Sequence, residues 1–276
     1  MIEYLPCIFL WWLAITFAGW LVFPLVFRCG MLLPDRGLGI AKLSGLMLVT
    51  LGATWLRFTG MGAAMGYAFA PIVWTVLALA AFNFMLSRRY AKAIRTFFQE
   101  GGWRMALCYE AAFGIAYLLF LWFRSHFPDA TFDVQFYGAE KWVNLTTLTA
   151  LWRNAGIPPM DPWLSDHSMN YYYFSHLIWA MLARVSGTVP EVAFNLGLGT
   201  TFALLVTMAF SAGWALTERK RGACIAVFLI AFAGPILTWS QLPALMKTVK
   251  VSGLGDALQN FSFWAPSDAI PNTRNE

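Results

Sequence analysis

Charged residues are scarce in this sequence. Only 12% of the 276 residues are Asp, Glu, Lys or Arg, whereas 59% are hydrophobic. Soluble domains carry about 25% charged and about 45–50% apolar residues. A chain with half that charge cannot cover a water-facing surface, which excludes an ordinary soluble domain and predicts a protein embedded in a lipid bilayer. The 14 Trp and 24 Phe residues agree, because aromatic rings anchor membrane helices at the headgroup level.

Several catalytic and cofactor-binding motifs are also missing. There is no Walker loop, GxGxxG turn, GxSxG elbow or HExxH motif, so nucleotide chemistry on the inner side has no support. The four cysteines form no CxxC pair, and we interpret them as packing residues: Cys7, Cys29, Cys108 and Cys224. The net charge of +5 is modest, and its placement indicates membrane topology rather than a nucleic-acid partner.

Six apolar segments are long enough to cross a bilayer, which takes about 20 residues per helix. They are Tyr4–Phe27, Ala41–Phe58, Gly66–Leu86, Met105–Phe123, Val192–Leu216 and Ala223–Leu242. A seventh apolar segment, Tyr171–Ala183, has only 13 residues. We therefore expect it to be a re-entrant or surface-lying helix. The predicted fold class is an all-α polytopic membrane protein with about six transmembrane helices.

The basic residues predict the orientation. Three short links, Arg28–Lys42, Arg88–Arg104 and Thr217–Gly222, hold 11 of the 19 Lys and Arg residues. Cytoplasmic loops carry an excess of these residues. We therefore expect a prokaryotic plasma-membrane protein with an extracytoplasmic N-terminus and a long external segment from Arg124 to about Pro190.

Two further features concern the membrane itself. The link Arg88–Arg104 has the spacing of an amphipathic surface helix with Ile94, Phe97 and Phe98 facing lipid. Glu110 lies inside the fourth span, where a carboxylate is a functional candidate by default. The alternative is that its side chain extends toward Arg104 at the membrane surface.

The external segment gathers acidic residues. Five of the 14 acids lie between Arg124 and Asn170: Asp129, Asp133, Glu140, Asp161 and Asp166. Residues 139–154 read as a helix with an apolar stripe that could lie on the membrane, formed by Trp142, Leu145, Leu148 and Trp152. Hard divalent cations such as Mg²⁺ or Mn²⁺ bind carboxylate oxygens. A metal held there would neutralise a lipid-linked phosphate, but a solvated polar face is the alternative interpretation.

The ordered set of motifs resembles the bacterial and archaeal "YYY" membrane proteins, an uncharacterised family named for its tyrosine run. The matching pieces are Leu33–Lys42, Pro128–Asp129, Gly138–Lys141, Pro158–Trp163, Asn170–Phe174, Ala193–Leu196 and Phe263–Ser267. Asn144 departs from the pattern, since the family usually has an acid there. The C-terminal motif of the family continues beyond Asn275–Glu276, so we expect this chain to be an N-terminal part of a longer protein.

The family looks like a distant branch of the GT-C glycosyltransferases, which use polyprenyl-phosphate-linked sugars. The resemblance implies a GT-C-like unit from the fourth span, residues 105–276 with the loop 124–190, after an N-terminal three-helix region, residues 1–104. It implies catalytic roles for Asp129, Glu140 and Asp133, with Asp129 and Glu140 as metal ligands. The implied substrate-binding residues are Lys141, Asp161, Trp163, Asn170, Tyr171, Tyr172, Tyr173 and His176.

Three functions are therefore open. The first is a transferase that moves a sugar from a polyprenyl phosphate on the outer face. The second is a transporter or lipid-handling protein, with Glu110 in the pathway and the external loop as a lid. The third is a non-catalytic membrane subunit that docks a partner through its tyrosines and tryptophans.

Overall fold

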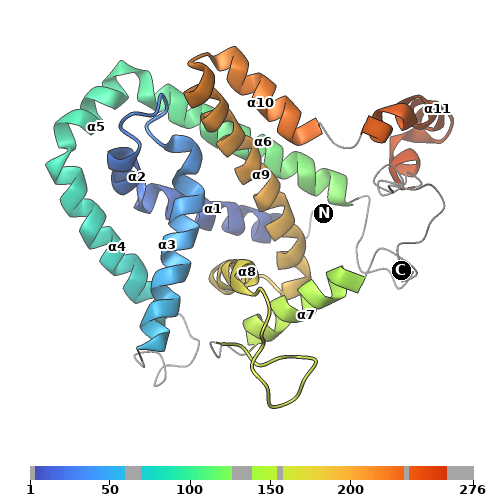
Figure 1. Ribbon diagram of the computed structural model, residues 1–276, viewed down its shortest axis with the longest axis horizontal. Coiled ribbons are helices and arrows are strands. Elements are labelled where there is room, and N and C mark those ends of the chain that lie inside the picture. The colour runs from blue at the N-terminus through green and yellow to red at the C-terminus, as the bar shows by residue number, and fades with distance from the viewer. Residues whose placement is uncertain (1–3, 60–69, 126–138, 154–157, 233–235, 260–276) are drawn as a thin grey trace.

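The computed structural model describes residues 4–59, 70–125, 139–153, 158–232 and 236–259, and within these ranges the chain is helical without a β-strand (Figure 1). The elements in chain order are α1 (Leu5–Leu21), α2 (Phe23–Cys29), α3 (Leu38–Phe58), α4 (Ala70–Arg89), α5 (Ala91–Phe97), the π-helical turn η2 (Phe98–Gly102), α6 (Trp103–Ser125), α7 (Ala139–Arg153), α8 (Phe174–Ser186), α9 (Pro190–Thr217), α10 (Lys220–Phe232) and α11 (Ile236–Gln259). The all-α prediction is confirmed.

Four helical segments are long and apolar enough to cross a membrane: Leu38–Phe58, Pro71–Arg89, Ala91–Ser125 and Pro190–Thr217. A fifth is present if α1 and α2, which are bent by 52°, form one broken span. The predicted sixth span, Ala223–Leu242, is not confirmed among the described residues. There α10 has only 13 residues, and α11 begins at Ile236.

The break between α1 and α2 has a local cause. We expected one straight span from Tyr4 to Phe27, but Pro24 lacks an amide hydrogen and cannot donate to the Trp20 carbonyl one turn earlier. The Trp20 carbonyl instead accepts the amide of Val22, which ends α1. Proline therefore bends the chain where the apolar pattern alone continues.

The basic link folds back onto the protein. In place of a surface helix facing lipid, α5 and η2 pack Ile94, Phe97 and Phe98 against a buried cluster that includes Phe23 and Phe27. The ring centroids of Phe27 and Phe97 are 5.6 Å apart in an edge-to-face arrangement. These three side chains are therefore partly buried against protein, and only their remaining surface faces outward as predicted. Their buried parts pack on residues of α2 and α6.

The main core joins α1, α3, α6, α7, α8 and α9. Trp11 of α1 is fully buried there, and its indole nitrogen donates to the Thr200 hydroxyl of α9 at 2.9 Å. Gly45 lets α3 approach α1 closely, since a Cβ at this position would lie 2.1 Å from the Ala18 carbonyl oxygen. Small residues at helix contacts are how membrane helices gain close packing.

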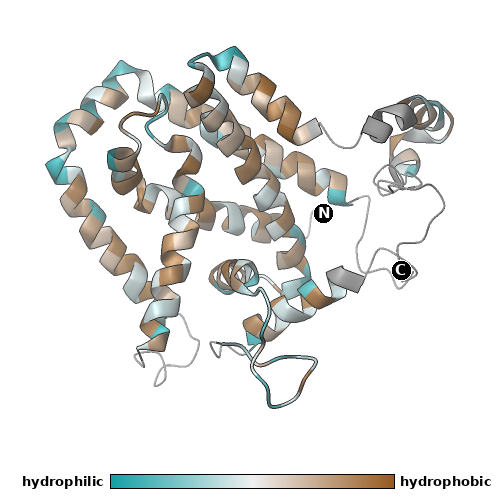
Figure 2. Ribbon diagram, viewed as in Figure 1, coloured by the Kyte–Doolittle hydropathy of each residue, from teal (hydrophilic) through white to brown (hydrophobic). Residues whose placement is uncertain are grey.

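The two ends of the molecule differ in character. The α2–α3 turn, the α5–η2 link and the α9–α10 turn, which carry the basic residues, lie on the upper side of Figure 1, whereas α7, α8 and the 158–173 loop lie on the lower side. Figure 2 shows hydrophobic residues along the helices and hydrophilic residues at these connections. This arrangement agrees with the topology expected from charge. The direction of insertion and the division of the chain at residue 104 stay predictions.

Candidate functional site

The α7 helix supports the acid-rich segment, and its bounds agree with the prediction. Part of its predicted apolar stripe packs inward, because Leu148 is fully buried and Trp152 packs against the core with α8 and α9, as does Leu151 beside them. Arg184 of α8 places its guanidinium 4.5 Å from the Trp152 ring centroid and donates to the Trp152 carbonyl. This helix is thus a fixed part of the protein.

The predicted catalytic residues are only partly placed. Glu140 and Lys141 lie in the first turn of α7, but their side chains are outside the described part of the structure. Asp129 and Asp133 fall in residues 126–138, also outside it. Among the described residues, no three His, Cys, Asp or Glu side chains gather as a metal site. The metal ligands Asp129 and Glu140 therefore remain a prediction.

The segment Pro158–Tyr173 forms a short closed loop. The Asp161 amide donates to the His167 carbonyl at 2.8 Å, and the Met169 amide donates to the Pro159 carbonyl at 2.8 Å. Pro159 and Met169 are buried and anchor the loop. Its backbone therefore has a defined shape although most of its side chains are exposed.

Asp161 has a structural partner within this loop. Its Oδ1 accepts the amide hydrogen of Trp163 at 2.8 Å, which is the side-chain-to-backbone turn that Asp and Asn favour. The Trp163 side chain is 66% exposed. The geometry thus gives Asp161 a turn-forming role and leaves the indole of Trp163 available to a ligand.

The tyrosine run is divided between two surroundings. Tyr171 and Tyr172 are 61% and 82% exposed, with ring centroids 5.0 Å apart, and Asn170 beside them is also exposed. Tyr173 is the residue that begins α8 and packs against the main core. Of the three tyrosines grouped by sequence, two form an exposed aromatic pair and the third holds the helix in place.

His176 lies in the first turn of α8. The side chain is half-buried, and this burial lowers the pKa of the imidazole, while a hydrogen bond to the Tyr172 backbone acts in the opposite direction. The neutral form is therefore favoured. Neutral imidazole can both donate and accept a hydrogen bond.

A groove of about 420 Å³ lies between α1, α3, α4 and α8. Thr50 is the one polar side chain among its lining residues, and α8 contributes Ile178, Met181, Leu182 and Val185. The groove has no signal in the sequence, since its residues come from four distant helices and are unremarkable in each. It is large enough for part of a hydrocarbon chain.

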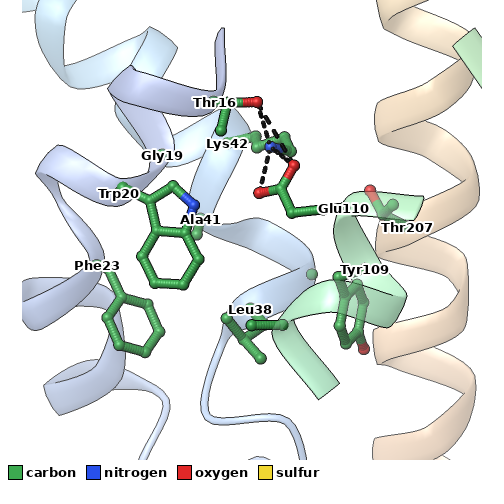
Figure 3. Close-up of a pocket in the computed structure, with 12 residues that line it drawn as sticks. Thr16, Gly19, Trp20, Phe23, Leu38, Ala41, Lys42, Tyr109, Glu110 and Thr207 are labelled. Atoms are coloured by element: carbon green, nitrogen blue, oxygen red, sulfur yellow. Dashed lines mark hydrogen bonds and ion pairs between the residues drawn. The ribbon is translucent and has the colours of Figure 1, made fainter. Parts of the chain in front are cut away.

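A buried ion pair lies in a second region, between α1, α3 and α6 (Figure 3). The Lys42 Nζ is 2.7 and 2.6 Å from the two carboxylate oxygens of Glu110, and it donates to the Thr16 hydroxyl at 3.0 Å. The Phe113 ring lies 5.0 Å from the same nitrogen. All three ammonium hydrogens thus have an acceptor, which is the arrangement a charge needs away from water.

The pair corrects two expectations. Lys42 was counted in a basic link, but it lies inside α3 with only 7% of its surface exposed. Glu110 was expected to act alone or to extend toward Arg104, and it instead pairs with Lys42. The missed signal was that two opposite charges inside apolar spans predict each other as partners.

A cavity of about 20 Å³ adjoins this pair, with room for about one water molecule (Figure 3). Tyr109 lines it, and its hydroxyl faces Asp35 and Ser211 without a hydrogen bond of standard geometry. Asp35 is itself 1% exposed and accepts the amides of Gly37 and Gly39, each at 3.0 Å. It therefore caps the start of α3 beside the pair.

Comparison with known protein families gives the chain a family. Residues 48–276 match the family described as "Uncharacterized membrane protein (DUF2298)". The chain belongs to this family. Neither the comparison with curated proteins nor that with solved structures found a match.

Membership in this family identifies the chain as a membrane protein, in agreement with its long apolar helices. The matched residues include α6 to α11, and therefore the closed loop and Glu110, but Lys42 precedes them. The structure of this chain thus offers two candidate sites with different chemistry. One is an exposed aromatic loop beside an apolar groove, and the other is a neutralised ion pair within the helices.

Proposed function

We propose that this DUF2298 protein is a GT-C-like transferase that moves a sugar from a polyprenyl-phosphate donor to an acceptor on the outer face of a prokaryotic plasma membrane. One observation carries the proposal. The α8 helix follows directly from the exposed pair Tyr171–Tyr172 and lines the apolar groove with its next turns. The α8 helix thus connects an aromatic surface suited to a sugar with an apolar groove suited to a prenyl chain.

The chemistry requires one base and charge neutralisation. A carboxylate, for which Asp129 is the first choice and Asp133 the competitor, takes the proton of the acceptor hydroxyl. The acceptor oxygen forms a bond to the anomeric carbon, and the bond from that carbon to the phosphate oxygen breaks. The phosphate stays on the lipid, and Mg²⁺ or Mn²⁺ held by Glu140, together with Asp129 where Asp133 is the base, would balance its charge.

The described residues would serve binding. Tyr171, Tyr172 and Trp163 offer flat apolar faces with polar edges to the sugar. His176 and Asn170 lie in or next to the same segment and supply hydrogen-bonding groups. Lys141 of α7 would add a further donor. Asp161 supports them indirectly by fixing the turn before Trp163.

The test is a transfer assay on the purified protein reconstituted in lipid. Product is measured with a polyprenyl-phosphate hexose, with a soluble hexose phosphate, and with and without a metal chelator. Asp129→Asn and Glu140→Gln should each lower the rate by about 100-fold. The matched control Asp166→Asn, an exposed acid of the same loop, should remain within about twofold.

Two results would overturn the transferase proposal. The first is the absence of product from any lipid-linked sugar. The second is an equal effect of the Asp129 and Asp166 substitutions, which would remove any special role of the first. If a soluble donor works as well as the lipid-linked donor, only the assignment of the apolar groove to the prenyl chain is contradicted.

A transport or lipid-handling role is the second candidate, and the buried Lys42–Glu110 pair favours it. Ionisable side chains within membrane helices often mark pathways for ions or protons. In that case Glu110→Gln should abolish transport of the substrate across vesicle membranes while the variant still folds. Asp129→Asn should leave this transport unchanged. If Asp129→Asn instead abolishes sugar transfer and Glu110→Gln leaves it unchanged, the transferase is supported.

A further inference from the structure

A basic pocket lies at the end of the molecule opposite the closed loop. It has a volume of about 460 Å³ and is lined by residues of α2, the α2–α3 turn, the end of α4, α5 and η2. These elements lie together on the upper left of Figure 1. Its lining includes Arg36, Arg89, Lys92, Glu100, Tyr90 and Phe97. The proposed sugar transfer uses none of these residues.

The described residues neutralise the positive charge in this pocket only in part. Among the described residues the one salt bridge is Lys42–Glu110, so neither Arg89 nor Lys92 is paired with a described carboxylate. Glu100 is the single acid in the lining, against three cations. Three like charges held around one opening repel one another, and a bound anion relieves that repulsion.

A fourth cation reinforces the field. Arg28 donates from Nε to the Tyr90 hydroxyl at 2.8 Å, and the guanidinium carbons of Arg28 and Arg89 lie 5.7 and 5.9 Å from the Tyr90 ring centroid. Arg36 donates to the Met31 carbonyl, which fixes it to the α2–α3 turn. The three arginines are therefore held by contacts that leave donors for a ligand, because a guanidinium carries five N–H groups.

The depth of the pocket points to a lipid. Arg89 is the last residue of a segment, Pro71–Arg89, that is apolar and long enough to cross the bilayer. The end of such a span lies at the level of the lipid phosphates. Phe97 adds the exposed part of its ring to the same pocket, and the buried Phe27 ring lies behind it. A soluble phosphate would use only the cations, whereas the glycerol and first methylene groups of a phospholipid also cover the exposed part of Phe97.

We infer that this pocket binds the phosphate headgroup of an anionic phospholipid at the basic end of the protein. Basic pockets between membrane helices on the cytoplasmic side are known to recognise such headgroups. The inference is independent of the proposed sugar transfer, which is placed at the opposite end.

Native mass spectrometry of the purified full chain tests this, with phosphatidylglycerol, cardiolipin or phosphatidylcholine titrated into the detergent. We expect the anionic lipids to be retained in preference to phosphatidylcholine. The double variant Arg89→Ala/Lys92→Ala should bind them about 30-fold more weakly, since each of the two basic contacts near the surface contributes on the order of 1 kcal/mol. The control Arg219→Ala/Arg221→Ala removes two cations from the α9–α10 turn and should change binding by less than about twofold.

Three outcomes would overturn the inference. An equal loss in both double variants would indicate a general charge effect, and no preference in the unmodified protein would exclude a site. Displacement of the lipid by millimolar inorganic phosphate would assign the pocket to a soluble anion. If the double variant does not fold, the single substitutions Arg89→Gln and Lys92→Gln at exposed positions provide the same comparison.

Discussion

Polar side chains have opposite surroundings in the helix interior and in the closed loop between α7 and α8. Inside, the side chains of Lys42 and Glu110 are 9% and 23% exposed, and they satisfy each other. In the loop, the backbone makes the hydrogen bonds, while Trp163 and Tyr172 remain largely exposed. The comparison shows that polar side chains which complete each other's hydrogen bonds hold the fold. Exposed aromatic side chains on a fixed backbone are instead available to a ligand.

Breaking the interior pair should produce the largest effect. Glu110→Gln leaves the Lys42 ammonium buried without a counter-charge, and removing one partner of such a pair costs about 3 kcal/mol or more. Thermal or denaturant unfolding in detergent measures this loss. Unchanged stability would show that the pair is solvated or dispensable.

A steric change tests the packing around the same pair. Gly45→Ala would place a Cβ 2.1 Å from the Ala18 carbonyl oxygen, so α1 and α3 must separate. We expect a loss of about 2 kcal/mol in unfolding free energy. Gly114→Ala is the matched control, because a Cβ there meets no atom within 4 Å and alanine favours a helix. Equal effects of the two substitutions would contradict the close approach of α1 and α3.

In the closed loop, the effect of replacing Asp161 should depend on whether the new side chain keeps an acceptor oxygen, and not on its charge. Asp161→Ala removes the acceptor for the Trp163 amide and should cost about 1 kcal/mol, seen as faster hydrogen exchange at residues 161–169. Asp161→Asn keeps an acceptor oxygen and should preserve the turn. If the Asn variant exchanges as fast as the Ala variant, the negative charge itself has a role.

The smallest effect is expected at the exposed aromatic pair. Tyr172→Ala should change the unfolding free energy by less than about 0.5 kcal/mol, as is usual for surface positions. Tyr173→Ala is its neighbour and contrast, since Tyr173 packs on the core and its loss should cost about 2 kcal/mol. Similar costs at both positions would contradict the division of the tyrosine run.

Helix positions were largely predictable from the sequence. The apolar lengths placed α3, α4, α6 and α9, and the Gly and Pro residues after Arg153 marked the end of α7. These features depend on neighbouring residues in the chain. The bend at Pro24 was also readable, since proline acts locally, but the uninterrupted apolar run obscured it.

The direction of each apolar face was not predictable. Leu148 and Phe97 lie on stripes that suit lipid and protein equally well, and both face protein in the structure. In a bilayer the solvent is itself apolar, so hydrophobicity does not distinguish an inward from an outward face. The same reason hides the apolar groove.

The candidate site was predictable in part. The motif spacing located the exposed residues Trp163, Tyr171 and Tyr172 in one segment, but it also included Asp161 and Tyr173, which have structural contacts. The partner of Glu110 lies 68 residues away in the sequence and is set by helix packing. The roles of Asp129, Asp133 and Glu140 stay predictions.

The most direct test of the contrast between the two regions is the coupling free energy between Lys42 and Glu110, measured by a double-mutant cycle. Lys42→Met, Glu110→Leu and the double variant are compared in detergent by unfolding and by transport or transfer activity. We predict a coupling of about 3 kcal/mol, with a double variant close to the unmodified protein in both stability and activity. A folded but inactive double variant, or a coupling near zero, would contradict the structural role of the pair and place function inside the helices.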